Sequence, residues 1–141
     1  MTGRKGSSTN TEVDSNGYTI KDSGVRKQFK SGMIRDSEDK VLYSLIPLWM
    51  LDRFAEHLTK GAKKYKKRNW EKAETPQELD RFIDSAWRHW RALLAGEVEE
   101  DHFSALIFNL CGMEHTKKRI GKDWQKKLEE FRMKEGNKWA K

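Results

Sequence analysis

The segment Thr75-Pro76-Gln77-Glu78 predicts where one helix of this chain begins. A threonine at the N-cap, a proline at the first helical position and a glutamate three residues after the cap together form a capping box. Apolar residues then recur every three or four positions, as on one face of a helix. They are Leu79, Phe82 or Ile83, Ala86, Trp90, Leu93 and Leu94. Gly96 offers a stop, so we expect a helix between residues 76 and 95.

Similar spacing predicts further helices. Pro47 suits the first turn of a helix whose apolar stripe is Leu51, Phe54, Leu58, Ala62 and Tyr65. A third helix, capped by Asp101, runs through the mostly apolar residues 103–113 to Gly121. The tail, residues 123–141, can form another.

The composition favours narrow apolar stripes over a sheet that is buried on both faces, because only 35% of residues are hydrophobic and 36% are charged. We therefore predict an all-α protein, a helical bundle of three to four main helices with an extended, partly disordered N-terminal segment. The predicted division is a disordered or loosely ordered segment 1–28, an all-α domain 29–121 and a basic C-terminal helix 122–141. Cys111, the one cysteine, lies in an apolar run and is expected in the core.

The charge pattern points to an anionic partner. The formal net charge is +7, and basic residues are dense between Lys60 and Lys72. No apolar stretch reaches the length of a membrane span, and the N-terminus lacks the apolar block of a signal peptide. We expect a cytoplasmic protein that has no membrane partner.

Two acidic features allow a structural and a functional interpretation. Asp52 and Glu56 share a predicted helix face with Lys60 and with Lys63 or Lys64, which suits surface ion pairs or a metal ion beside phosphates. The acidic segment 97–101 can favour the start of the following helix or supply carboxylates to Mg²⁺ or Mn²⁺. Asn109, on the apolar third helix, is either structural or faces a ligand.

Three blocks occur in a fixed order, and together they resemble the phage dATP/dGTP diphosphohydrolase family, which is related to MazG-like all-α nucleoside triphosphate pyrophosphatases. The resemblance covers roughly residues 29–118. The blocks are Arg35-Asp36 with Lys40 and Tyr43 before Leu45-Ile46-Pro47; Gly61-Ala62-Lys63-Lys64-Tyr65 with Arg68-Asn69-Trp70; and Arg88-His89 followed by Gly96-Glu97 and Asn109.

The resemblance implies a Mg²⁺-dependent enzyme that converts a (deoxy)nucleoside triphosphate, with a preference for purines, into a monophosphate and pyrophosphate. It also implies a role in phage nucleotide-pool control, in the host cell cytoplasm if the chain is viral. The MazG relatives assemble as dimers or tetramers, so we expect a homo-oligomer.

The candidate residues of the site follow from the resemblance and from the chain's own charges. The MazG pattern of Glu-x-x-Glu followed by Glu-x-x-Asp does not occur in that form. The predicted catalytic and Mg²⁺-binding (or Mn²⁺-binding) residues are Glu56, Asp84, Glu97 and Asp101, one of which would orient or deprotonate water. The predicted substrate-binding residues are Arg35, Lys60, Lys63, Lys64, Tyr65, Arg68, Asn69, Trp70, Arg88, His89 and Asn109.

A second function fits the same lysines and tryptophans. A non-enzymatic binder of a nucleotide or of single-stranded nucleic acid would use cationic and stacking side chains, would need no metal ion and would weaken steeply with salt.

Overall fold

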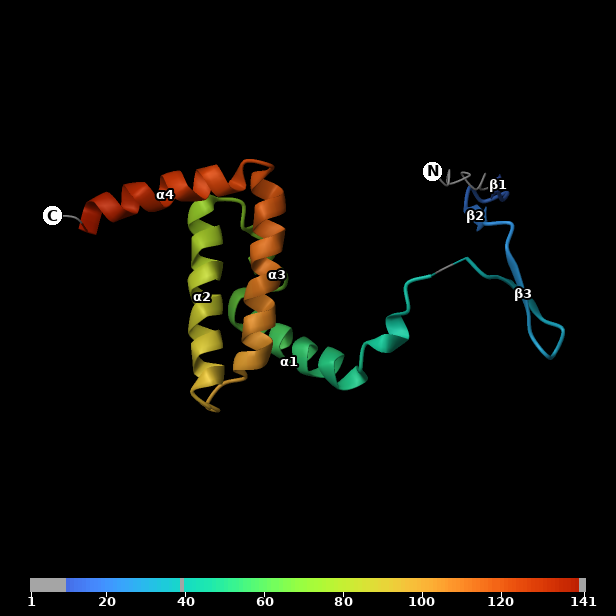
Figure 1. Ribbon diagram of the computed structural model, residues 1–141, viewed down its shortest axis with the longest axis horizontal. Coiled ribbons are helices and arrows are strands. Elements are labelled where there is room, and N and C mark those ends of the chain that lie inside the picture. Colours follow the sequence, from blue (N-terminus) through green and yellow to red (C-terminus); the bar gives the residue numbers. More distant parts are fainter. Residues whose placement is uncertain (1–9, 39, 140–141) are drawn as a thin grey trace, which may run out of the picture. The chain divides into compact units, whose positions relative to one another are not determined.

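The computed structural model describes residues 10–38 and 40–139. These residues form two compact units, which divide between Leu45 and Ile46. The first unit holds short strands, and the second holds the helices (Figure 1). The predicted boundaries after residues 28 and 121 stay predictions.

The first unit contains two antiparallel hairpins. Strand β1 (Asn10–Val13) pairs with β2 (Thr19–Asp22), and β3 (Arg26–Gln28) pairs with β4 (Ile34–Asp36). The first turn is held by the Asp14 carboxylate, which accepts hydrogen bonds from the backbone N–H groups of Asn16 and Tyr18 at 2.8 and 2.9 Å. The sequence pattern did not predict these strands. Residues 1–9 of the predicted disordered segment lie outside the described residues.

Asp36 connects the two hairpins of this unit. Its carboxylate accepts hydrogen bonds from the backbone N–H and the hydroxyl of Ser23 and from the backbone N–H of Glu38. These bonds, above all the one from the Ser23 hydroxyl, hold the pKa of Asp36 well below its usual range. None of the described side chains of this unit is buried. A short 3₁₀ helix (Tyr43–Leu45) ends the unit.

Helix α1 (Leu48–Tyr65) opens the second unit after Pro47, as the sequence predicts. Phe54, Leu58 and Ala62 of its predicted apolar stripe are partly buried, whereas Leu51 and Tyr65 at the two ends of the stripe are exposed. The helix packs on α3, and its first turn remains open to solvent.

Helix α2 (Pro76–Leu94) begins at the predicted capping box. The Thr75 hydroxyl accepts the backbone N–H of Glu78, and the Glu78 carboxylate accepts the backbone N–H of Thr75. Leu79 and Ala86 of the predicted stripe are buried, while Leu94 at the end of the helix is exposed.

Helix α3 (His102–Ile120) lies beside α2, and this pair forms the centre of the unit (Figure 1). Asp101 caps α3 and Gly121 ends it, as the sequence predicts. Gly112 lets the two helices approach, because it lies directly against the ring of Phe82. The prediction that Cys111 lies in the core is wrong, since its side chain is exposed on α3. The apolar run around it is wider than the surface that α1 and α2 cover.

Helix α4 (Trp124–Trp139) lies across one end of the α2–α3 pair (Figure 1). Leu128 is its buried residue among the described side chains, and Arg132 Nε donates to Asp80 Oδ1 of α2 at 2.7 Å. The predicted fold class, an all-α bundle behind an extended N-terminal segment, is confirmed. Across residues 10–38 and 40–139, no helix has both the length and the apolar character that crossing a membrane requires.

The connection between α1 and the 3₁₀ helix η2 (Asn69–Lys72) is strained. Lys66 has φ 75° and ψ 160°, and Arg68 has φ 59° and ψ 22°. They are the non-glycine residues with positive φ in the described part of the chain. The Lys66 conformation is one that glycine adopts almost exclusively, and it costs about 1–3 kcal/mol in other residues.

We expect Gly112→Ala to destabilise the protein by about 2 kcal/mol, because the new methyl group would overlap the Phe82 ring in a closely packed interface. Chemical denaturation would measure the change. Gly61→Ala is the matched control: this helical glycine has open space around its Cα, so the substitution should stabilise α1 by about 0.5–1 kcal/mol. Equal effects of the two substitutions would contradict the packing argument.

We expect Lys66→Gly to stabilise the protein by about 1 kcal/mol, because relief of the backbone strain exceeds the added entropy of the unfolded chain. Lys67→Gly should instead lower the free energy of unfolding by about 0.5–1 kcal/mol, because Lys67 has no positive φ. A loss of stability in Lys66→Gly would show that the loop is not strained.

Candidate active site

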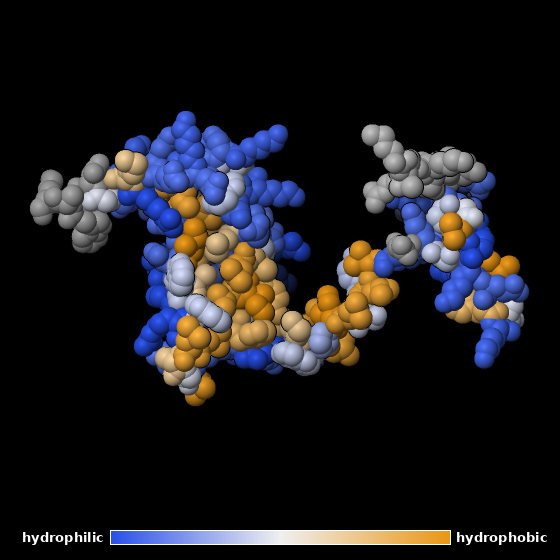
Figure 2. Space-filling view, in the orientation of Figure 1, coloured by the Kyte–Doolittle hydropathy of each residue, from blue (hydrophilic) through white to orange (hydrophobic). Residues whose placement is uncertain are grey.

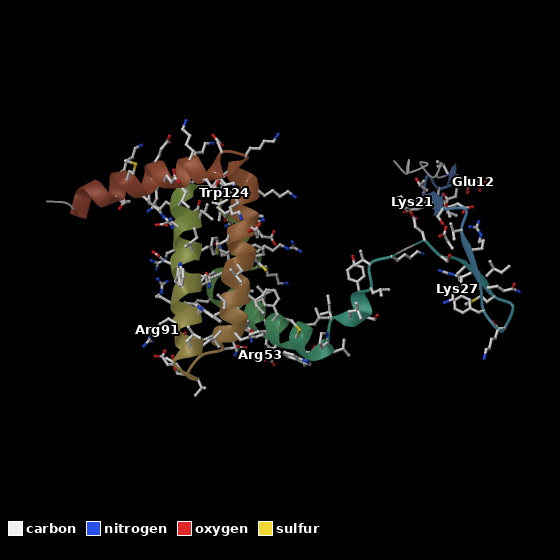
Figure 3. All side chains as sticks on the ribbon, viewed as in Figure 1. Glu12, Lys21, Lys27, Arg53, Arg91 and Trp124 are labelled. Atoms are coloured by element: carbon white, nitrogen blue, oxygen red, sulfur yellow. The ribbon has the colours of Figure 1, made fainter. Side chains whose placement is uncertain are left out.

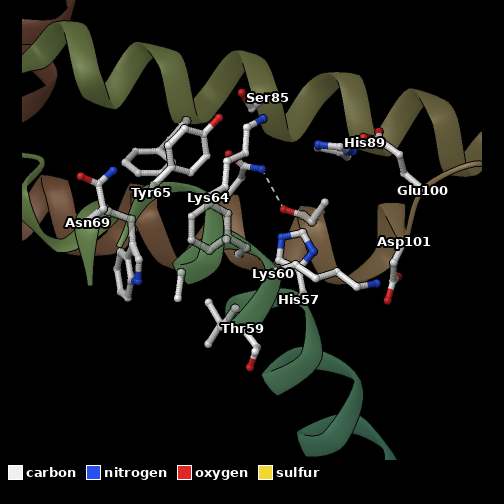
Figure 4. Close-up of a pocket in the computed structure, with 18 of the residues that line it drawn as sticks. His57, Thr59, Lys60, Lys64, Tyr65, Asn69, Ser85, His89, Glu100 and Asp101 are labelled. Carbon is white, nitrogen blue, oxygen red and sulfur yellow. Dashed lines mark hydrogen bonds between the residues drawn. The ribbon is translucent and has the colours of Figure 1, made fainter. Parts of the chain in front are cut away.

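A cleft of about 1600 Å³ lies among α1, η2, α2, the α2–α3 loop and the first half of α3. Figure 4 shows side chains of α1 facing those of α2 and of the loop across it. A concave surface of this size can enclose a nucleotide-sized ligand.

One face of α1 supplies a wall of cationic and imidazole side chains. Their positions differ by four, three and four residues, which places them on one side of a helix. They are Arg53, His57, Lys60 and Lys64. Lys64 Nζ lies 4.9 Å from the centre of the Tyr65 ring, and contact with Tyr65 raises the pKa of Lys64. This wall presents positive charge to whatever enters the cleft.

More positive charge comes from the strained loop and from α2. Lys66, Lys67 and Arg68 line the same cleft, as does Arg81 of α2. Arg68 contacts Glu71 at 3.2 Å, whereas Arg81 has no ion pair among the described residues. Cations gathered on a concave wall concentrate anionic ligands.

The aromatic side chains of the cleft differ in their freedom. Trp70 makes edge contacts with Phe108 and His115, with ring centres 5.9 and 5.2 Å apart. These contacts fix the indole in the helix packing. Tyr65 is more than half exposed and is free to stack on a ligand.

Asn109 is buried on α3 and lines the cleft. Its Nδ2 donates to the carbonyl of Ala105 at 2.8 Å. Oδ1 has no hydrogen-bond partner in the described part of the chain. Every fully buried side-chain polar atom there has a partner, so Oδ1 is not fully buried and can reach a ligand. The residue therefore has a structural bond and a free acceptor.

Two histidines and a glutamate form a hydrogen-bonded chain at the other end of the cleft. Glu99 Oε1 lies 2.9 Å from His102 Nε2, and His102 Nδ1 lies 2.9 Å from His89 Nδ1. A carboxylate accepts only, so the His102 ring donates from Nε2. His102 Nδ1 then accepts the N–H of His89 Nδ1, a tautomer assignment that follows from this network.

Burial affects two imidazoles in the cleft. It lowers the pKa of His89, to which His102 adds a smaller effect in the same direction. Burial also lowers the pKa of His57, against a smaller opposite effect of Asp101. Both rings are therefore mainly neutral near pH 7, and each can accept a proton.

The carboxylates of the α2–α3 loop are not equivalent. Glu97 Oε1 accepts from Arg91 Nη1 at 2.5 Å. Glu100 Oε2 lies 3.8 Å from His102 Nδ1 and makes no hydrogen bond among the described residues. Two groups have ligand atoms near enough to share a metal ion, His89 with Glu100 and His102, and Glu97 with Glu99 and His102.

Asp101 is held by structural bonds. Its oxygens accept from Arg53 Nε and Nη2 at 2.9 and 2.8 Å, and from the backbone N–H and hydroxyl of Ser104. Figure 3 labels Arg53 at helix α1. The hydrogen bonds from Arg53 hold the pKa of Asp101 well below its usual range. The carboxylate therefore joins α1 to the start of α3.

The structure brings most of the sequence-predicted residues together. Those that line the cleft are Lys60, Lys64, Tyr65, Arg68, Asn69, Trp70, His89, Glu97, Asp101 and Asn109. Glu56, Lys63, Asp84 and Arg88 belong to the same unit and do not line it. Arg35 lies on β4 in the other unit. The four predicted metal ligands are thus not gathered at one place.

Sequence reasoning placed the polar face of α1 one residue too early. It grouped Asp52 and Glu56 with the lysines, whereas the cleft receives Arg53 and His57. The spacing of residues 53, 57, 60 and 64 also predicts a shared helix face. The apolar stripe of α1 is too weak to decide which of the two faces turns toward the cleft. The other missed residues of the cleft are Arg81, Glu99, Glu100 and His102.

The family comparison covers the part of the chain that forms the cleft. The model of the family described as "dATP/dGTP diphosphohydrolase, N-terminal" matches residues 31–127, well over half of the chain. No curated protein and no solved structure gives a significant match. The matched range includes every residue that lines the cleft. The chain therefore belongs to the dATP/dGTP diphosphohydrolase N-terminal family.

Proposed function

We propose that the protein hydrolyses purine deoxynucleoside triphosphates between the α and β phosphates, which yields a monophosphate and pyrophosphate. One observation carries the proposal beyond the family match: the cleft has a cationic wall facing a cluster of imidazoles and carboxylates. Phosphoanhydride hydrolysis needs both, because charge must be neutralised on the phosphates and a water must be oriented. In a phage setting the reaction would control the nucleotide pool.

The substrate would lie along α1. Lys60, Lys64 and Arg68 neutralise the triphosphate, since all three line the cleft and lysine and arginine are common phosphate ligands. Tyr65 stacks on the base, and Asn109 Oδ1 accepts a hydrogen bond from an amino group of the purine.

His57 is the proposed proton acceptor. Its neutral ring lies on the same helix face as Lys60 and can take a proton from the attacking water. The water oxygen bonds to the α-phosphorus as the bond to the bridging oxygen breaks, and pyrophosphate leaves. A divalent cation, when bound, neutralises charge on the phosphate oxygens.

The four carboxylates predicted to bind Mg²⁺ do not fit one ion. Asp101 is hydrogen-bonded to Arg53 and Ser104, Glu97 is paired with Arg91, and Glu56 and Asp84 do not line the cleft. Mg²⁺ demands a near-ideal octahedral set of oxygen ligands, which these four residues do not provide together. The proposed hydrolysis nevertheless requires a divalent cation, Mg²⁺ or Mn²⁺.

Lys64→Ala should lower kcat/KM for purine deoxynucleoside triphosphates by about 10–100-fold, because one charged phosphate contact is lost. Chromatographic detection of monophosphate and pyrophosphate, with Mg²⁺, Mn²⁺ or Co²⁺ in separate reactions, would measure it. Lys63→Ala is the matched control, because Lys63 is the neighbouring lysine and does not line the cleft. It should retain nearly full activity.

Absence of pyrophosphate release with every nucleotide and every metal ion would rule out the enzymatic proposal. Binding that is insensitive to chelator and falls steeply with salt would then support the non-enzymatic alternative. Equal losses in Lys63→Ala and Lys64→Ala would show that general charge, rather than the cleft, governs binding.

The proposal includes self-association through α1. Helix α1 has no buried residue, and its first turn exposes Leu48, Trp49 and Leu51 (Figure 2). We call these three residues the α1 patch. An amphipathic helix gains most of its stability by burying its apolar side. A second copy of the chain, in a dimer or tetramer, would cover the patch.

Trp49→Glu should shift the protein toward the monomer by at least about 10-fold in dissociation constant, because it places a charge in the α1 patch. Light scattering after size-exclusion chromatography would measure the mass. Met133→Glu is the control, since this exposed apolar residue lies on α4. A monomeric wild-type protein, or equal effects of both substitutions, would contradict the interface.

A further inference from the structure

The two Nδ1 atoms of His89 and His102 are close enough to share one cation. They lie 2.9 Å apart. His89 is in the last two turns of α2, and His102 is the first residue of α3. A proton bridges them in a hydrogen bond. Metal–nitrogen bonds of about 2.1 Å separate adjacent ligand nitrogens by about 3.0–3.4 Å. The two rings now point Nδ1 at Nδ1 along one line, so a metal ion can replace that proton once both rings turn toward a point off this line.

Glu99 orients the His102 ring for this role. Its Oε1 accepts from His102 Nε2 at 2.9 Å, which leaves Nδ1 as the ring nitrogen that can bind a metal ion. Histidines that bind metal ions usually donate their other ring N–H to a carboxylate or carbonyl. His102 itself is 5% exposed, so its position is set by packing.

Glu100 completes the group. Its Oε2 lies 3.8 Å from His102 Nδ1, and the ligand atoms of His89, Glu100 and His102 all lie within 4.8 Å of one another. The alternative group of Glu97, Glu99 and His102 would require two bonds to break. Glu97 is paired with Arg91, and Glu99 is the hydrogen-bond acceptor of the His102 ring.

We infer that His89, His102 and Glu100 form a site for a transition-metal dication such as Co²⁺, Mn²⁺ or Zn²⁺, in preference to Mg²⁺. Imidazole nitrogens suit transition metals, whereas Mg²⁺ prefers oxygen ligands and water. Three protein ligands leave coordination positions open. All three residues line the cleft that also holds Lys60 and Lys64, so a bound ion would lie in the same hollow as the proposed phosphates.

The site is independent of the proposed function, which supplies only the role of the ion. Binding is therefore measured without nucleotide. Loss of turnover in a protein that still binds Co²⁺ would contradict the enzymatic proposal alone, and turnover without specific Co²⁺ binding would contradict the site alone.

The test titrates the metal-free protein with Co²⁺ and follows its visible absorption and calorimetric heat. We expect about one ion per chain and an absorption band typical of nitrogen ligation. A large excess of Mg²⁺ should not displace the ion. His89→Ala and Glu100→Gln should each weaken Co²⁺ binding by at least about 100-fold, and Glu99→Gln by about 10–100-fold.

The variants avoid the buried His102, whose replacement would risk unfolding. Asp84→Asn is the matched control, because this exposed carboxylate of α2 does not line the cleft and should bind Co²⁺ as the wild type does. Circular dichroism without metal should be unchanged in all variants. For Glu99→Gln, weaker Co²⁺ binding at an unchanged metal-free melting temperature separates positioning of His102 from a structural role.

Three results would overturn the inference. They are absence of Co²⁺ binding at millimolar concentration, affinity that is equal in the wild type, His89→Ala and Glu100→Gln, and displacement of Co²⁺ by an equal concentration of Mg²⁺.

Discussion

The carboxylate of Asp101 joins the elements on which the cleft depends. It accepts a hydrogen bond from the backbone N–H of Ser104 at the start of α3, and two parallel hydrogen bonds from Arg53 of α1. Such paired, charge-assisted bonds fix orientation as well as distance. Because Glu100 and His102 are its neighbours in the chain, the same contact that docks α1 also fixes the imidazole and carboxylate cluster. A residue predicted to bind metal thus builds the frame around the predicted site.

The cleft gathers charges of both signs. Lysines and arginines of α1 and of the loop after it line it together with the carboxylates of the α2–α3 loop and two histidines. Arg53 is paired with Asp101, whereas Lys60 and Lys64 have no ion pair in the described part of the chain. A polyanionic ligand can therefore neutralise these lysines, while a cation occupies the cluster of imidazoles and carboxylates. The two ligands would reinforce each other's binding, because their charges are opposite.

Local signals in the sequence predicted the helices better than the site. The capping box at Thr75 and the N-cap at Asp101 involve contacts within four residues, so their chemistry can be read directly. The rotation of α1 about its axis depends on which weakly apolar residues α3 covers. This rotation determines that His57, rather than Glu56, lines the cleft. The His89–His102 contact depends on how the α2–α3 loop folds back, which no spacing rule gives. The hairpins of residues 10–36 lack an alternating apolar pattern and are set by turns, such as that at Asp14.

The exposed thiol of Cys111 has a practical consequence. The chain has one cysteine, and the residue lies on α3 without lining the cleft. A thiol-reactive spin label or fluorophore will therefore attach at a single position and leave the nucleotide-sized hollow unobstructed. Because the side chain sits on a helix fixed by α2, the label would follow the motion of the helical unit itself. In air, the same thiol would link two copies through a disulfide that a reducing environment prevents.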